Sequence, residues 1–239
     1  MTFYQSIAEH YDQIFPLNKT QLSFVKNSFE NTSDLSVLDI GCGTGNLSFE
    51  LSRHFEKVTA IDLDKTMLEK AIEKNVYHIQ FLSKDMLKIE KEFGQDTFDA
   101  IVCFGNTLVH LDGPNEILDF FKQALKVLKK DGKLLLQTIN YDRIIDHDVK
   151  GLPTIENDKI KFVRNYHIHP DQNAIDFETI LTVKETGQQI ENNINLYPLQ
   201  NLELINLLYQ AGFKEIFFFK NFSREVITDD SIPLVVEAR

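Results

Sequence analysis

The stretch SVLDIGCGTG, residues 36–45, is the part of the sequence that decides the fold. Its first five residues are mostly apolar and predict a buried strand that ends at Gly41. Three of the ten glycines then fall within five residues, at Gly41, Gly43 and Gly45, and apolar residues recur every four positions over 47–55. The sequence therefore predicts a strand, a glycine-rich loop and a helix in direct succession, which is a building unit of α/β sheets.

The loop of this unit has the composition of a nucleotide-binding site. Glycine permits unusual backbone angles and lets a ligand approach the main chain, while a helix N-terminus offers unpaired N–H groups. An acidic residue that binds the ribose is expected at the end of the next strand, about 20 residues on. Asp62 follows a predicted strand over 58–61 and lies 21 residues after Gly41.

The spacing of the glycines restricts the kind of nucleotide. The pattern is G-x-G-x-G, not the G-x-G-x-x-G of NAD-binding loops, and no Gly-Lys-Ser/Thr of a phosphate-binding loop follows. Asp39 lies two residues before the first glycine, where a carboxylate would repel a pyrophosphate and attract a cation. We expect an adenosine with a cationic amino-acid tail, and an NAD-dependent oxidoreductase is the less favoured alternative.

Strands and helices continue to alternate along the chain. Further strands are expected over 77–82, 98–104, 133–138, 213–219 and 232–237, and helices over 65–75, 114–128 and 199–211. This alternation predicts an α/β fold with a mostly parallel sheet covered by helices on both faces. Three stretches of period-2 character between 159 and 197 predict a small antiparallel β insert, within about 140–197, in a single domain spanning 1–239.

Composition excludes several classes of protein. The 239 residues include 36 acidic side chains and 25 Lys and Arg, a net charge of −11, which disfavours binding to a nucleic-acid backbone. No apolar run approaches the roughly 18 residues of a membrane span, and the N-terminus does not resemble a signal peptide. Two cysteines are too few for a disulfide framework. We expect a cytoplasmic protein without nucleic-acid or membrane partners.

Residues 37–46 (VLDIGCGTGN) resemble the first motif of the class I S-adenosylmethionine-dependent methyltransferases. The resemblance continues at 60–64, at Asp85 and Met86, and at 98–102. It implies a Rossmann-like seven-stranded sheet and S-adenosylmethionine as cofactor, with Asp62 on the ribose and Asp85 and Met86 against the adenine. The cofactor-binding residues implied in this way are Asp39, Gly41, Cys42, Gly43, Asn46, Asp62, Leu63, Asp85, Met86 and Phe104.

Two further segments, 105–111 and 140–142, are similar to the glycine/sarcosine N-methyltransferases. In those enzymes an arginine before the Asn-Tyr-Asp segment binds the substrate carboxylate, whereas this chain has Ile139 at that position. Arg143 and Arg164 are the alternative sources of a guanidinium. The resemblance implies a small polar methyl acceptor, with Asn106, Tyr141, Arg143 and Arg164 as its binding residues.

The N-terminal segment 4–12 (YQSIAEHYD) resembles the helix that closes over the cofactor in many small-molecule methyltransferases. We therefore expect a lid helix over about 1–30. Tyr4 and Tyr11 are seven residues apart and share one face of such a helix. Tyr11 is expected to contact the cofactor or the substrate; the alternative is that both rings only pack the helix onto the domain.

Methyl transfer from a sulfonium is an in-line displacement that depends mainly on positioning and on removal of water. A general base is needed only when the nucleophile arrives protonated. His110, just beyond the fourth predicted strand, is the candidate base, and a purely structural histidine is the alternative. His167 and His169 share one face of a predicted strand, but no recognisable ligand set surrounds them, so no metal is expected.

The sequence thus favours transfer of a methyl group from S-adenosylmethionine to N or O of a small molecule. An RNA or protein methyltransferase, and a non-catalytic regulatory protein that binds S-adenosylmethionine, are the alternatives.

Overall fold

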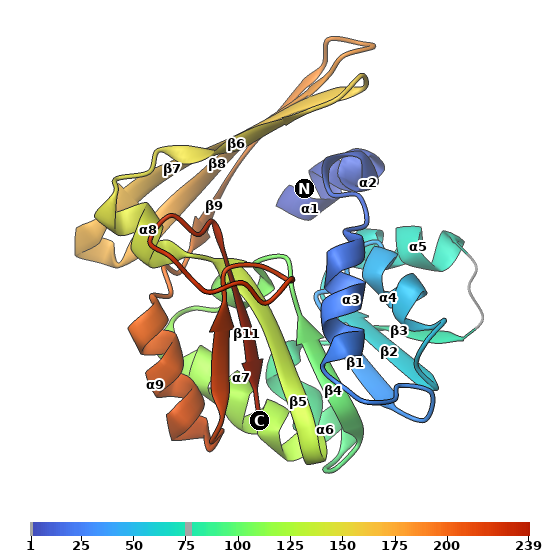
Figure 1. The fold of residues 1–239 in the computed structure, drawn as a ribbon. Coiled ribbons are helices and arrows are strands. Elements are labelled where there is room, and N and C mark those ends of the chain that lie inside the picture. The colour runs from blue at the N-terminus through green and yellow to red at the C-terminus, as the bar shows by residue number, and fades with distance from the viewer. Residues whose placement is uncertain (1, 75–77) are drawn as a thin grey trace.

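The computed structural model describes residues 2–74 and 78–239 and contains, within these ranges, two β-sheets (Figure 1). The first has seven strands in the order β10-β11-β5-β4-β1-β2-β3. These strands are β1 (Ser36–Ile40), β2 (Lys57–Asp62), β3 (Ile79–Ser83), β4 (Phe98–Cys103), β5 (Leu128–Ile139), β10 (Ile216–Phe219) and β11 (Pro233–Ala238). All pairings are parallel except those of β11 with β5 and β10. The predicted α/β fold with a mostly parallel seven-stranded sheet is confirmed.

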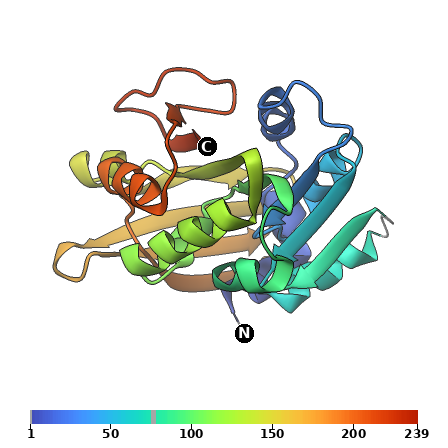
Figure 2. The ribbon, with the colours of Figure 1, turned by 90° about the horizontal axis from the view of Figure 1, so that it is seen from below.

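Helices cover both faces of this sheet, because successive residues of each buried strand point to opposite sides. Leu38 and Ile101 pack with residues of α7 (Pro114–Val127) and α9 (Asn201–Ala211), which lie side by side in Figure 2. Val37 and Val102 pack on the other face with Phe24 of α3 (Lys19–Asn27) and with residues of α4 (Asn46–Leu51). The remaining helical segments around this sheet are α5 (Lys65–Glu73), α6 (Ile89–Phe93) and the short 3-10 helices η2 (Met86–Lys88) and η3 (Thr107–His110).

The second sheet is an antiparallel meander in the order β6-β7-β8-β9. Its strands are β6 (Gly151–Glu156), β7 (Ile160–His169), β8 (Ala174–Val183) and β9 (Gln189–Leu196), with η4 (Pro170–Gln172) between β7 and β8. The insert was predicted with three strands, and β6 is the additional one. Gly151 and Pro153 weaken its strand pattern, and the structure accommodates the proline on an edge strand with an irregular register.

The N-terminal region differs from the single lid helix expected over about 1–30. Within residues 2–30 it forms α1 (Phe3–Ile7), η1 (Ala8–His10), α2 (Tyr11–Ile14) and, after a loop, α3. Pro16 explains the break, because it lacks an N–H and disfavours helical angles at the residue before it. Asn18 then starts α3 by accepting a hydrogen bond from Thr20 N at 3.0 Å. Figure 1 shows α1 and α2 between the second sheet and the side of the domain that carries α5.

Most other boundaries lie within a few residues of the sequence prediction, but β5 begins at Leu128 and not at the expected position 133, and α8 (Tyr141–Asp146) is an additional helix. The expected end of one helix at Asn75 and the expected start of β3 at Tyr77 lie outside the described residues. In the described ranges, no helix has the length and apolarity needed to cross a membrane.

A buried ion cluster joins the last strand to the rest of the domain. Glu237 of β11 is only 5% exposed and accepts hydrogen bonds from Lys133 of β5 at 2.8 Å and from Arg224 at 2.6 Å. The hydroxyl of Ser28, at the end of α3, donates to the same carboxylate at 3.1 Å. Burial alone would raise the pKa of Glu237, but the bonds from Lys133 and Arg224 hold this pKa below its ordinary value.

We expect Glu237→Gln to destabilise the fold by about 3 kcal/mol, because the charges of Lys133 and Arg224 would lose their partner. Glu215→Gln is the matched control: Glu215 pairs with Arg239 at an exposed site, where a pair is worth below about 1 kcal/mol. Urea unfolding at neutral pH measures both values, and equal losses in the two variants would contradict this role for the cluster.

Comparison of the wild-type protein with Glu237→Gln also tests how the stability depends on pH. Because the folded-state pKa of Glu237 is lowered, its contribution is fully present above the unfolded pKa of about 4.3 and disappears as the pH falls through the folded pKa. The difference in stability between the wild-type protein and Glu237→Gln should therefore shrink in acid. A difference that stays constant down to the acid transition would refute the assignment.

Candidate functional site

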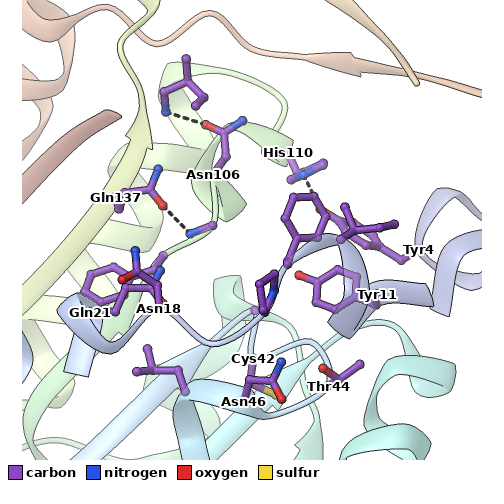
Figure 3. A pocket seen from close by; sticks show the side chains of 18 of the residues that line it. Tyr4, Tyr11, Asn18, Gln21, Cys42, Thr44, Asn46, Asn106, His110 and Gln137 are labelled. Atoms are coloured by element: carbon purple, nitrogen blue, oxygen red, sulfur yellow. Dashed lines mark hydrogen bonds between the residues drawn. The ribbon is translucent and has the colours of Figure 1, made fainter. Parts of the chain in front are cut away.

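A cavity of about 670 Å³ lies at the carboxyl ends of the central strands, beneath the second sheet. Gly41 follows β1, Phe104 follows β4 and Ile139 ends β5, and all three line the cavity. Tyr11 of the N-terminal region and Tyr166 of β7 close it from the other sides. Open α/β sheets bind their ligands at this edge. Figure 3 shows the polar side chains that project toward the cavity.

The glycine loop needs glycine because other parts of the chain approach its backbone closely. Gly41 and Gly43 have φ angles of 69° and 55°, in the left-handed region. A Cβ atom on Gly41 would lie 2.5 Å from the Thr107 side chain, and one on Gly43 would lie 3.3 Å from the Tyr11 ring. Side chains at these two positions would displace Thr107 and Tyr11.

Most of the loop's N–H groups are already used within the protein. Gly41 N and Cys42 N donate to Ile61 O at 2.8 and 3.1 Å, and Gly43 N donates to Asp62 Oδ2 at 2.8 Å. Gly45 N donates back to Cys42 O at 2.9 Å. A loop with these donors occupied is a poor cradle for a pyrophosphate. This geometry favours the cationic ligand expected from the sequence over a dinucleotide.

Asp39 supplies a negative charge at the cavity wall. Its side chain is 4% exposed and accepts a hydrogen bond from Ser48 Oγ at 2.6 Å. Burial raises its pKa to about 6, and the bond from Ser48 partly opposes this rise. A cation bound in the cavity would stabilise the ionised carboxylate.

Asp62 lies behind the loop in this structure. Its carboxylate accepts from Gly43 N and from Asp64 N, the latter at 2.9 Å, and burial raises its pKa. It does not line the cavity, and the Tyr11 ring packs against the loop on the cavity side. Burial, with the nearby charge of Asp62, also raises the pKa of Tyr11.

The structure therefore divides the cofactor-binding residues expected from the sequence into two groups. Those that line the cavity are Tyr11, Asp39, Gly41, Cys42, Asn46 and Phe104. Those that lie off its wall are Gly43, Asp62, Leu63, Asp85 and Met86. Leu63 is 66% exposed, and Asp85 caps η2 by accepting from Leu87 N at 2.9 Å.

Among the expected acceptor-binding residues, Asn106 and Arg164 line the cavity, whereas Tyr141 and Arg143 do not. Tyr141 begins α8 and is fully buried, and its hydroxyl accepts from Asn106 Nδ2 at 3.0 Å. Asn106 Oδ1 accepts from Ile139 N at 2.9 Å (Figure 3). The Asn106 side chain thus fixes the loop after β4 to the end of β5.

His110 and Tyr4 form a pair beside the cavity, both among its lining residues. The Tyr4 hydroxyl lies 2.9 Å from His110 Nε2 (Figure 3). Loss of hydration lowers the pKa of His110, so the ring is neutral near pH 7. Burial raises the pKa of Tyr4, so its hydroxyl keeps its proton and can donate it to Nε2 when the imidazole carries its own proton on Nδ1.

Several lining residues were not expected from the sequence. They include Phe15, Asn18 and Gln21 of the N-terminal region, and Gln137, Tyr166 and Phe177. Gln137 alone carried a local signal, since it is a polar residue in an apolar strand; its Oε1 accepts from Gly105 N at 2.8 Å. The others come together only through the fold.

The N-terminal region is tied directly to the glycine loop. Asp12 accepts hydrogen bonds from Thr44 and, at 2.9 Å, from Asn46 Nδ2, and it forms an ion pair with Lys74 at 2.8 Å. Lys74 also donates to Thr44 O at 2.9 Å. These contacts hold α2 across the loop, in the position expected of a lid.

Metal ligands do not gather in the described part of the chain: residues 2–74 and 78–239 contain no group of three or more His, Cys, Asp or Glu side chains placed to hold an ion. His167 and His169 lie near single acidic residues of β8, Glu178 at 3.6 Å and Asp176 at 3.0 Å.

Comparison with known proteins identifies the class. Residues 37–132 match a family model described as a methyltransferase domain. The glycine/sarcosine N-methyltransferase of Aphanothece halophytica is 30% identical over 199 residues, which cover 81% of this chain and 72% of that protein. A putative methyltransferase of Geobacillus sp. (strain WCH70) is 26% identical, over 95% of this chain and 96% of its own length.

Solved structures share the fold. The CcbJ methyltransferase from Streptomyces caelestis superposes with a TM-score of 0.81 at 22% identity, over 100% of this chain and 98% of that one. CalS10 from Micromonospora echinaspora, an amino pentose methyltransferase solved with S-adenosylmethionine bound, gives a TM-score of 0.76 at 16% identity, over 98% and 96%.

The chain belongs to the class I S-adenosylmethionine-dependent methyltransferases. It is an enzyme of that class, and its cofactor is S-adenosylmethionine. The residues fit this cofactor. Asp39 offers a negative charge to its cationic part, the glycine loop lets it approach the main chain, and Phe104 forms an apolar wall.

The raised pKa of Asp39 predicts a pH-dependent cofactor affinity. A carboxylate attracts a cation only when it is ionised, so binding should weaken as the pH falls through about 6, by up to about tenfold per pH unit. Titration calorimetry between pH 5 and 7 measures the profile. Asp39→Asn should flatten it, and Ser48→Ala should move its midpoint upward because the bond from Ser48 lowers the pKa. An unchanged slope in Asp39→Asn would show that another group titrates.

Proposed function

We propose that this methyltransferase acts on a small molecule and that the acceptor atom is a nitrogen or an oxygen. The observation that carries the proposal is that the cavity is covered on the side opposite the central strands. The N-terminal region and the inner face of the second sheet cover the carboxyl ends of the central strands, so that residues such as Tyr4, Phe15 and Phe177 line the cavity opposite Gly41 and Phe104. A covered cavity with aromatic walls suits a small acceptor better than an RNA or a folded protein.

Similar proteins support the same substrate class. The Aphanothece relative is named as acting on glycine and sarcosine, and CalS10 on an amino pentose. KedS8 from Streptoalloteichus, a sugar N-methyltransferase, has a TM-score of 0.67 at 18% identity over 99% of this chain and 87% of that one. The net charge of −11 adds an argument against RNA.

The residues around the cavity can assist the transfer in three ways. When bound, S-adenosylmethionine supplies a methyl group already activated by the sulfonium. Asp39 balances positive charge next to the glycine loop. The rings of Tyr4, Phe15 and Phe177 exclude water from the nucleophile, which strengthens its attack.

The Tyr4–His110 pair can accept the proton that an ammonium or hydroxyl nucleophile must lose. His110 is neutral, and in the tautomer protonated on Nδ1 its Nε2 accepts the hydrogen bond from the Tyr4 hydroxyl. A proton taken up by the Tyr4 oxygen would release the tyrosine proton to His110, so the pair acts as a relay. The reaction would then leave His110 protonated and the Tyr4 hydroxyl intact.

His110→Gln should lower kcat by about a hundredfold, the usual scale of general-base catalysis, and change KM much less. Its rate should rise with pH as the acceptor loses its own proton, whereas the wild-type rate levels off above the lowered pKa of His110. Tyr4→Phe should give a smaller loss. A variant with the wild-type pH profile would leave His110 a structural role only.

The substrate class is tested by incubating the enzyme with isotope-labelled S-adenosylmethionine and a cell extract. We expect the label in the small-molecule fraction, where mass spectrometry identifies the product. Asp39→Asn serves as a control impaired in cofactor binding. Label in RNA or protein would refute the proposal, and cofactor binding without any transfer would favour a regulatory protein.

Cys42 and Cys103 are both unpaired in the part of the chain that the structure describes. Unpaired thiols suit a reducing compartment. We therefore place this activity in the cytoplasm.

A further inference from the structure

Three polar side chains form a row across the inner face of the second sheet. The strand register places Arg164 of β7 opposite Thr179 of β8, and Thr179 opposite Asn192 of β9. Side chains of residues that are directly opposite in antiparallel strands lie on the same face. The adjacent rows on this face are apolar or aromatic: Phe162, Leu181 and Ile190 on one side, and Tyr166, Phe177 and Ile194 on the other.

Each member of the row has a buried polar atom without a hydrogen-bond partner among the described residues. These atoms are Arg164 Nε, Thr179 Oγ1 and Asn192 Nδ2. Arg164 Nη2 donates to Pro153 O at 2.5 Å, and Asn192 Oδ1 accepts from Ser6 Oγ at 3.1 Å. Buried polar atoms are nearly always paired, so three unused ones in a row indicate a missing partner. Two of the three are N–H donors, which suits a partner rich in oxygen.

Arg164 is also a cation without an anion. In the described part of the chain, no acidic group lies within ion-pair distance of it. Loss of hydration lowers the pKa of its guanidinium, which nevertheless stays protonated in proteins. A partly buried charge that lacks a counter-ion is costly, and a ligand can supply the counter-ion. Since Arg164 lines the cavity, the ligand would be the molecule bound there.

We infer that the methyl acceptor is a carboxylate with an apolar body and that Arg164 binds its carboxylate. The planar fork of a guanidinium matches a carboxylate, and a single cation balances its single charge. Tyr166 and Phe177, in the row next to Arg164, line the same cavity and would enclose the apolar body. Thr179 and Asn192 continue the polar row beyond Arg164 but do not line the cavity, so Arg164 alone would contact the carboxylate. This inference rests on the proposed small-molecule function and names the class of acceptor.

The probes are two carboxylates, 3-phenylpropanoate and 4-methylpentanoate, and the corresponding amides, which have the same shape without the charge. Binding to the enzyme saturated with S-adenosylhomocysteine is measured by titration calorimetry. We expect at least one carboxylate to bind roughly tenfold to hundredfold more tightly than its amide, the scale of a charge-assisted hydrogen bond. Equal binding of acid and amide, or binding of none of the four, would overturn the inference.

Variants of Arg164 test whether this residue causes the preference for the carboxylate over the amide. Arg164→Met should abolish the preference for the acid and leave amide binding unchanged, while Arg164→Lys should retain part of the preference and covers the case that the methionine variant folds poorly. Lys161→Met is the matched control, because Lys161 is exposed on the same strand and faces away from the cavity. A preference that survives in both Arg164 variants would refute the role of Arg164.

Failure of this inference is distinct from failure of the proposed function. If labelled methyl groups enter a small molecule that has no carboxylate, Arg164 has another role and the function stands. If the label enters RNA or protein, the function fails whatever the carboxylates do.

Discussion

The carbonyl oxygen of Ile61 accepts the N–H groups of Gly41 and Cys42, and the adjacent Asp62 carboxylate accepts that of Gly43. The end of β2 thus holds the glycine loop after β1 in place and uses the donors that would otherwise bind an anion. The left-handed angles of the loop follow from this geometry, and they let Thr107 and Tyr11 approach its backbone. At the cavity, the backbone of the loop can be approached closely by a ligand, and the carboxylate of Asp39 lies beside it. This arrangement suits a positively charged cofactor.

The elements around the glycine loop were predicted well, because the residues that determine them are contiguous in the sequence. A strand, a glycine loop, a helix and a second strand ending in Asp62 follow one another within about thirty residues, and local pattern and spacing are sufficient to identify them. Asp62 and four other residues expected at the cofactor lie off the cavity wall in this structure. The Asp62 carboxylate is bonded to Gly43 N and Asp64 N, and no local sequence pattern indicates these bonds.

The part of the cavity under the second sheet was less predictable, because segments that are far apart in the sequence form it. Phe15, His110, Tyr166 and Phe177 meet only after β4 has joined the first sheet and β7 and β8 have folded over it. Tyr141 follows β5 at the edge of the sheet where ligands bind, but α8 begins there and its ring is buried in the core. The strand β6 escaped prediction because its Gly and Pro residues are tolerated only at the edge position that the sheet gives it.

The N-terminal helices contact both the glycine loop and the second sheet. Asp12 bonds to the glycine loop, while Ser6 bonds to Asn192 of β9 and the Gln13 carbonyl accepts from Asn157 at 3.1 Å. The N-terminal region therefore forms a wall common to both parts of the cavity, and a shift of that wall for one ligand would change the surface that the other meets. Thermodynamic reciprocity then requires each ligand to alter the affinity of the other by the same factor. The segment that would carry such coupling runs from Ser6 to Gln13, because its contacts reach both the glycine loop and the second sheet.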